Sequence, residues 1–165
     1  MQNEQRIAIV PGSFDPITLG HLDILKRAAE QYDKVYLAVM INAEKNYMFT
    51  LEQRTKIAKA AVKELDNVSV ISSEGMLWEL AKSLGACSIV KGVRNENDRA
   101  YEQIMAEYNS KRYPAAETVL LPAREEHLHL SSTLVRGKIL ARESLSGLLP
   151  ETAIFEIQKI LPHTL

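Results

Sequence analysis

The chain has 165 residues, of which 46% are hydrophobic and 25% are charged, and these ordinary globular values exclude a disordered chain and a collagen. Its 20 Lys and Arg residues nearly balance 21 Asp and Glu residues, and the net charge of −1 argues against general nucleic-acid binding. We expect no membrane-spanning helix and no signal peptide, and the single cysteine, Cys87, favours a reducing cytoplasm. The length predicts one domain over residues 1–165.

Short apolar runs alternate with helical patterns along the chain. The runs that predict β-strands are rich in Val, Ile and Leu, and they are Ile7–Val10, Val35–Ile41, Val68–Ile71, Ser88–Lys91 and Thr118–Leu121. Because these runs are apolar on both faces, we expect helices to cover both sides of the sheet. The alternation of strand and helix over the whole length predicts an α/β fold with a parallel sheet and right-handed crossovers.

The predicted helices have apolar residues at spacings of three and four. Thr50 and Gln53 have the spacing of a capping box, and Gly85 stands where a helix would end. The segment Arg142–Pro150 is interpreted as a surface connection. The predicted apolar faces include Leu22 and Leu25, Ile57 and Val62, Leu77 and Leu80, Tyr101, Ile104, Met105 and Tyr108, and Leu134 and Ile139, and a last helix is expected from Glu151 to Leu161.

Cationic and hydroxyl side chains follow the predicted strands. In an open parallel sheet, ligands bind beyond the carboxyl ends of the strands. The residues found there are Lys45, Lys91, Arg94, Arg124, His21, Ser131, Ser132 and Thr133. A nearly neutral protein therefore concentrates positive charge at one edge of its sheet, which predicts a site for phosphate groups.

The segment Pro11–His21 (PGSFDPITLGH) joins the first strand to the first helix. Two prolines stiffen it, and two glycines let the backbone come close to another group. Its end leads into a helix N-terminus, whose free N–H groups suit an anion. It is neither a Walker loop nor a dinucleotide fingerprint. From the residues alone, a rigid connection with a capping histidine remains as good an interpretation as a phosphate site.

Four blocks of the sequence together resemble a known family. Pro11–Pro16 (PGSFDP) with Gly20 and His21 is similar to the first signature of the HxGH nucleotidylyltransferases in its T-x-G-H form, and more narrowly to that of the bacterial phosphopantetheine adenylyltransferases. The other blocks are Lys45 ahead of Met48–Glu52, then Lys91–Arg94 followed by Asp98, Tyr101 and Glu102, and finally Leu130–Thr133. The resemblance covers essentially the full chain and implies a Rossmann-like domain with a five-stranded parallel sheet and helices on both faces.

The resemblance implies a reaction in which the adenylyl group of ATP passes to 4′-phosphopantetheine, giving dephospho-coenzyme A and pyrophosphate. Such a transfer needs in-line positioning of two polyanions and neutralisation of the developing charge. By the same resemblance, His21 would donate a hydrogen bond to the α-phosphate. Lys45 would draw the two reacting phosphates together, and Arg94 would hold the β-phosphate and the leaving pyrophosphate.

The resemblance also implies binding residues. For phosphopantetheine these are Ser13, Lys45, Leu77 and Lys91. For ATP they are Ser13, Phe14, His21, Gly92, Val93, Arg94, Glu102, His127, Leu128, His129, Leu130, Ser131, Ser132 and Thr133. Lys91 departs from the family pattern, in which arginine is usual, so the charge is kept but the bidentate geometry is lost.

Structural interpretations of the same residues remain open. Lys45 alone is an ordinary loop lysine, Leu77 and Tyr101 suit a core, and Ser131 and its neighbours suit a helix N-cap. His127 and His129 alternate as metal ligands sometimes do. No other His or Cys stands at a recognisable ligand spacing, so we expect no metal site built from protein ligands.

Magnesium is expected with ATP, held mainly by phosphates and water. The resemblance further implies a homohexamer and feedback binding of coenzyme A, and we expect neither a nucleic-acid nor a membrane partner. Two alternatives remain. One is a sister enzyme acting on glycerol 3-phosphate or on nicotinate or nicotinamide mononucleotide, and the other is a non-catalytic, flavodoxin-like nucleotide-binding module.

Overall fold

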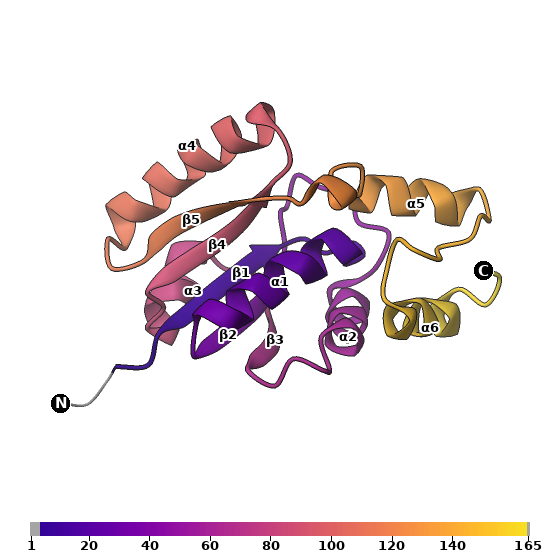
Figure 1. Cartoon of the computed structure of the whole chain (residues 1–165), viewed down its shortest axis with the longest axis horizontal. Coiled ribbons are helices and arrows are strands. Elements are labelled where there is room, and N and C mark those ends of the chain that lie inside the picture. The colour runs from indigo at the N-terminus through magenta and orange to yellow at the C-terminus, as the bar shows by residue number, and fades with distance from the viewer. Residues whose placement is uncertain (1–3, 165) are drawn as a thin grey trace.

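The computed structural model describes residues 4–164, which contain a five-stranded parallel sheet with helices on both faces (Figure 1). The strands are β1 (Ile7–Gly12), β2 (Lys34–Met40), β3 (Val68–Ser73), β4 (Ser88–Val93) and β5 (Glu117–Pro122), each within two residues of its predicted bounds. Their order is β3-β2-β1-β4-β5, so the direction of winding reverses between β1 and β4. The predicted α/β fold is therefore confirmed, and its switch point is the expected place for a ligand.

The helices connect the strands and then complete the chain after β5. They are α1 (Leu19–Gln31), α2 (Leu51–Ala61), α3 (Leu77–Leu84), α4 (Glu96–Arg112), the 3₁₀ turn η1 (Glu125–His127), α5 (Ser132–Leu140) and α6 (Glu151–Ile160). The predicted capping box is present, because Thr50 and Gln53 exchange backbone-to-side-chain hydrogen bonds. Gly85 ends α3 in the left-handed conformation, with φ of 64°. Within residues 4–164, no helix has the length and apolar character needed to cross a membrane.

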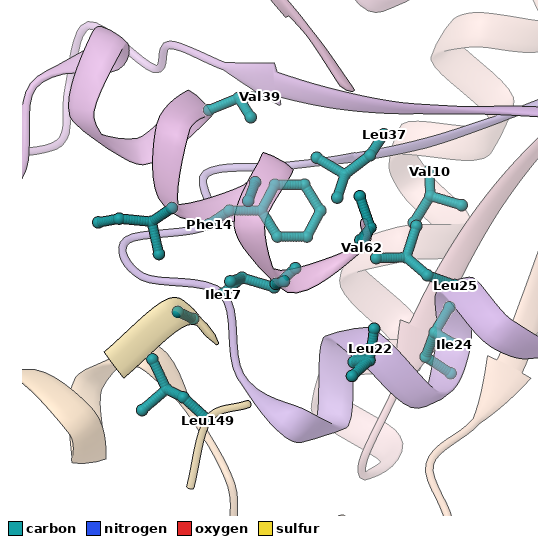
Figure 2. Packing of buried hydrophobic residues seen from close by; sticks show 14 of the residues in the cluster. Val10, Phe14, Ile17, Leu22, Ile24, Leu25, Leu37, Val39, Val62 and Leu149 are labelled. Carbon is teal, nitrogen blue, oxygen red and sulfur yellow. The ribbon is translucent and has the colours of Figure 1, made fainter. Parts of the chain in front are cut away.

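Two apolar clusters lie on the two faces of the sheet. Alternation along β1 sends Ala8 and Val10 to one face, where they pack with residues of α1, α2 and α6, while Ile9 points to the other face and packs near α3. In Figure 2, Leu25 and Val62 lie close to Val10 in the larger cluster. Because both faces are covered, the ends of the strands are where polar ligands can reach the sheet.

Two segments differ from the expectation. The apolar residues of α4 do not enter the core of this chain, since Tyr101, Ile104 and Met105 are 60%, 67% and 36% exposed. The segment Arg142–Pro150 is more than a surface connection, because Leu145 and Leu149 are buried in the larger cluster. Periodicity identifies an apolar helix face but not what covers it, and a few leucines in a short loop give no periodicity at all.

Candidate active site

A cavity of about 580 Å³ opens beyond the ends of β1 and β4, where the winding reverses. Its wall comes from the β1–α1 loop, the loop after β2, the end of β4, the face of α4 and the start of α5. The predicted site residues that line it are Ser13, Phe14, His21, Lys45, Lys91, Gly92, Arg94, Glu102, His127, Leu130, Ser131, Ser132 and Thr133. The fold thus brings the three expected catalytic side chains to one cavity.

Other predicted residues lie outside this lining. Val93 is buried in β4, and Leu77 packs against the apolar cluster on the α3 side of the sheet. Leu128 and His129 are exposed next to the cavity rather than in its wall. Arg124, expected at the same edge, instead pairs with Asp23 of α1, with 3.0 Å between Nε and Oδ1.

The imidazole of His21 is oriented by the start of α1. Thr18 is the N-cap, and its side chain accepts from the His21 backbone N–H. In return, the backbone N–H of Thr18 donates to Nδ1 of His21 over 3.0 Å. A backbone amide can only donate, so Nδ1 acts as the acceptor and the proton of the neutral ring belongs on Nε2.

The environment of His21 keeps its ring neutral. Burial is the largest cause, and the nearby charges of Lys91 and Arg94 add to it, so that its pKa falls from 6.5 to about 4. At neutral pH the ring is therefore an uncharged hydrogen-bond donor near two cationic side chains, Lys91 and Arg94. The edge of the ring meets the Phe14 ring, with 5.0 Å between the centroids.

Two glycines of the site leave room for neighbouring side chains of the protein itself. Phe14 has a φ of 46°, rare for a residue with a side chain, and its ring turns back over Gly12. A Cβ at Gly12 would stand 3.1 Å from that ring, and a Cβ at Gly92 would stand 3.0 Å from the Ile24 side chain of α1. These glycines let the β1–α1 loop and α1 pack closely against the strand ends.

Lys91 and Arg94 both have acidic partners on α4. The Lys91 ammonium lies 3.3 Å from a Glu102 carboxylate oxygen. Arg94 donates from Nε to Asp98 over 3.1 Å and from Nη1 to the Leu130 carbonyl over 3.3 Å. Arg94 is thereby oriented between α4 and the loop before α5.

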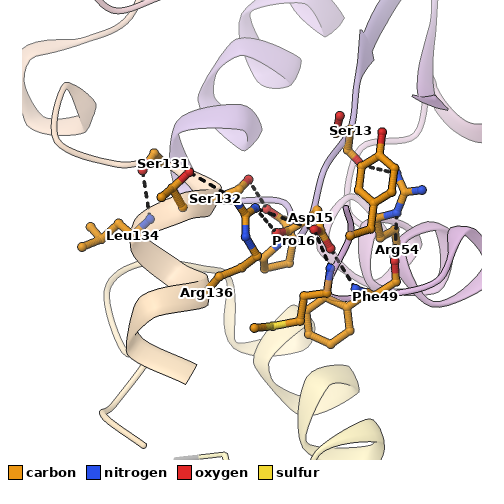
Figure 3. A network of polar contacts seen from close by, with 12 residues as sticks. Ser13, Asp15, Pro16, Phe49, Arg54, Ser131, Ser132, Leu134 and Arg136 are labelled. Atoms are coloured by element: carbon orange, nitrogen blue, oxygen red, sulfur yellow. Dashed lines mark hydrogen bonds and ion pairs between the residues drawn. The ribbon is translucent and has the colours of Figure 1, made fainter. Parts of the chain in front are cut away.

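A buried polar network that sequence reasoning missed supports the cavity floor (Figure 3). Arg54 of α2 is only 1% exposed, and it donates to the carbonyls of Ser13, Met40 and Phe49 at 2.7, 3.0 and 3.2 Å. Asp15 accepts from the backbone N–H groups of Met48 and Phe49 at 2.9 and 3.0 Å. An arginine on the apolar face of a predicted helix, beside Ile57, was the available signal.

The same network attaches α5 to the β1–α1 loop. Arg136 donates to the Asp15 carbonyl over 2.8 Å, and the Ser132 hydroxyl donates to the Pro16 carbonyl, also over 2.8 Å. Ser131 is the N-cap of α5, because its hydroxyl accepts from the Leu134 N–H. The N-terminus of α5 therefore faces the cavity, where its free N–H groups favour an anion.

Among the described residues, 4–164, no three His, Cys, Asp or Glu side chains lie together as metal ligands would. His127 also lines the cavity, and its Nε2 atom lies 3.8 Å from Oε1 of Glu126. The arrangement of neutral donor, cations and helix N-terminus suits phosphate groups.

Comparisons with known proteins agree with this chemistry. Residues 9–138 match the model of the cytidylyltransferase-like family. A phosphopantetheine adenylyltransferase of Limosilactobacillus reuteri is 43% identical over 145 residues, covering 88% of this chain and 84% of the relative. Enzymes of the same name from Clostridium novyi and Lactobacillus acidophilus are 39% and 40% identical, covering 92% and 95% of this chain and 94% and 98% of the relatives.

A solved structure has the same architecture. The crystal structure of a "Putative Nicotinate-nucleotide Adenylyltransferase" from Vibrio parahaemolyticus superposes with a TM-score of 0.73, covering 97% of this chain and 96% of that one. The two sequences are 19% identical, so this likeness shows the shared fold alone.

Proposed function

Because the chain belongs to the phosphopantetheine adenylyltransferases, within the cytidylyltransferase-like family, we propose that its cavity transfers the adenylyl group of ATP to 4′-phosphopantetheine. A phosphate oxygen of phosphopantetheine attacks the α-phosphorus of ATP. The bond from that phosphorus to its bridging oxygen breaks, and pyrophosphate leaves. The product is dephospho-coenzyme A, which makes the reaction a step of coenzyme A biosynthesis.

One observation carries this proposal: the start of α1, the loop after β2 and the end of β4 bring His21, Lys45, Lys91 and Arg94 to one cavity. Transfer between two polyanions requires no covalent help from the protein, but it does require their charges to be neutralised and their phosphates aligned. A protein that only bound a nucleotide would not need a second set of cations for an acceptor. The convergence therefore favours catalysis over the flavodoxin-like binding module.

His21 supplies a hydrogen bond from Nε2 to the α-phosphate. Because the ring is neutral, the interaction with the phosphate strengthens mainly as negative charge builds on the oxygens in the transition state. The bond from Thr18 holds the ring in the correct tautomer before substrate binds. His21 then acts as an oriented donor and not as a nucleophile.

Each of the three cations has its own phosphate groups to bind. Lys45 lies on an exposed loop and carries a point charge that can bridge the attacking phosphate and the α-phosphate. Arg94, oriented by Asp98, holds the β-phosphate and the pyrophosphate as it leaves. Lys91 leaves its ion pair with Glu102 when phosphopantetheine binds, and its ammonium then pairs with the phosphate of that substrate.

ATP lies with its phosphates at the N-terminus of α5 and its base near His127. Ser132 and Thr133 stand in the first turn of that helix, where backbone N–H groups and hydroxyls can both donate. Magnesium enters as part of the MgATP substrate, held by phosphate oxygens and water. This placement leaves the Lys45 side of the cavity for phosphopantetheine.

The homohexamer that the resemblance implies needs contacts between copies, and the exposed face of α4 supports such a contact. Tyr101, Ile104 and Met105 form an apolar stripe on the side of α4 turned away from the sheet. Such a stripe is stable in water when a second copy covers it.

Coenzyme A, which contains the product, would bind in the same cavity as a feedback inhibitor. The free thiol of Cys87 is compatible with a cytoplasmic enzyme.

An acceptor panel tests the function. Pyrophosphate release is measured with ATP and 4′-phosphopantetheine, with ATP and nicotinate or nicotinamide mononucleotide, and with CTP and glycerol 3-phosphate. We expect turnover with the first pair only. Turnover with glycerol 3-phosphate and CTP, together with none in the first pair, would reject the proposal.

A further inference from the structure

Tyr47 lines the cavity two residues after Lys45, and none of the roles above uses it. Its phenol oxygen accepts a hydrogen bond from the Asn42 backbone N–H over 2.7 Å. Its ring lies under the Arg54 guanidinium, with 3.9 Å between Cζ and the ring centroid. One side chain thus joins both ends of residues 42–47, called here the Lys45 loop, to a buried arginine.

The Lys45 loop has little else to hold it in place. Residues 43–46 are exposed. Within the loop, the Lys45 N–H donates to the Asn42 carbonyl and the Glu44 N–H donates to the Asn42 side chain, each over 3.0 Å. These two bonds shape a turn around Asn42. The bond from the Asn42 N–H to the Tyr47 phenol oxygen holds this turn in place. The position of Lys45 relative to the cavity therefore depends on where the Tyr47 ring lies.

Arg54 gives that ring a fixed support. Its guanidinium is bound by carbonyls from β2, the β1–α1 loop and the segment before α2. Burial lowers its pKa, while Tyr47 and Asp15 act in the opposite direction, but the guanidinium stays charged at neutral pH. A cation stacked on a tyrosine face is favourable when it is removed from water.

From this geometry we infer that Tyr47 is a positioning residue for adenylyl transfer, which holds the Lys45 ammonium over the reacting phosphates by closing the Lys45 loop onto Arg54. The inference rests on the proposed function, since it gives Lys45 its role. Tyr47 also lies beside Ser13, another residue of the cavity wall. Its contribution is to order the loop, and no proton transfer through the phenol is required.

A double-mutant cycle with Lys45 tests this role. Tyr47→Phe keeps the ring on Arg54 and removes the acceptor for Asn42, so we expect kcat to fall about fivefold. Tyr47→Ala removes both contacts, and we expect a fall of about thirtyfold because the lysine is no longer preorganised. In a Lys45→Ala background, Tyr47→Phe should change kcat by less than about twofold, since the residue acts through Lys45.

Matched measurements separate positioning from general destabilisation. Tyr36→Phe is the control, because Tyr36 is also partly buried with a lysine ammonium over its ring, but it lies outside the cavity. We expect unchanged kcat in this control, and a melting temperature for Tyr47→Phe close to that of the wild type.

Equal losses of kcat from Tyr47→Phe in the two Lys45 backgrounds would overturn this inference but leave the proposed function intact. Absence of turnover in the wild type with phosphopantetheine and ATP would instead reject the proposed function.

Discussion

The backbone N–H of Thr18 and the Nδ1 atom of His21 are joined by a 3.0 Å hydrogen bond at the first turn of α1. This bond leaves Nε2 as the protonated nitrogen and fixes the plane of the ring. The pKa of about 4 means that the ring is neutral when it donates. The histidine that we propose as the donor to the α-phosphate is thus oriented by the same contacts that cap a helix.

Replacing His21 by alanine should remove a transition-state donor. We expect turnover to fall about 10²-fold or more, as when one preorganised oxyanion donor is lost, with ATP binding retained. Pyrophosphate release measures the first quantity and titration calorimetry the second. His163→Ala, at an exposed site near the end of the chain, serves as the control. Unchanged turnover in His21→Ala would contradict the assigned role.

The lowered pKa of His21 also makes folding stability depend on pH. The folded pKa is about 4 and the unfolded value is 6.5, so between these values the unfolded chain binds more protons. Stability therefore decreases as pH falls through 6.5 toward 4, and this group accounts for about 2 kcal/mol between pH 7 and pH 5. Urea unfolding at both pH values should show a smaller loss in His21→Gln. Equal losses in the two proteins would show that the histidine is not the cause.

Lys91 stands where the resemblance implies an arginine. Lys91→Arg restores a planar group that can contact two phosphate oxygens, so we expect the Michaelis constant for phosphopantetheine to fall, with little change in kcat. Lys82→Arg on the exposed side of α3 is the matched control. A raised constant would indicate instead that lysine is matched to Glu102, its partner at 3.3 Å.

The stripe on α4 gives a prediction about assembly. Ile104 is 67% exposed, and a carboxylate in its place would be buried without a partner in any interface formed by this face. We expect Ile104→Asp to lower the molar mass measured by light scattering, while Gln103→Asp on the same helix does not. A mass that is identical for Ile104→Asp and the wild type would exclude this face as the contact between copies.

Much of the fold was accessible from local patterns. The five strands, the Thr50 capping box and the Gly85 helix end depend on the chemistry of a few adjacent residues, so they could be predicted without knowledge of the rest of the chain. The cations after the strands could also be placed at one edge, because parallel strands present their carboxyl ends together. That rule led to the cavity and to its cationic and hydroxyl side chains, whereas the resemblance supplied the other predicted residues of the wall, such as Ser13 and Glu102.

The rule could not say which cations turn toward the cavity. Arg124 follows β5 as Arg94 follows β4, yet Arg124 turns to Asp23 and Arg94 lines the cavity. The choice depends on a carboxylate of α1, about a hundred residues away along the chain. No local pattern contains that information.

The amino-acid order alone therefore specified where strands begin, how helices are capped and which side chains could meet phosphate at the edge of the sheet. Only the folded chain decided that Asp15 and Arg54 would be buried under the cavity, that His21 would be neutral, and that Tyr47 would lie against a buried guanidinium. The reason is that burial and charge proximity are properties of the assembled protein. They depend on which distant segments come together, whereas caps and strand ends depend on neighbours in the chain.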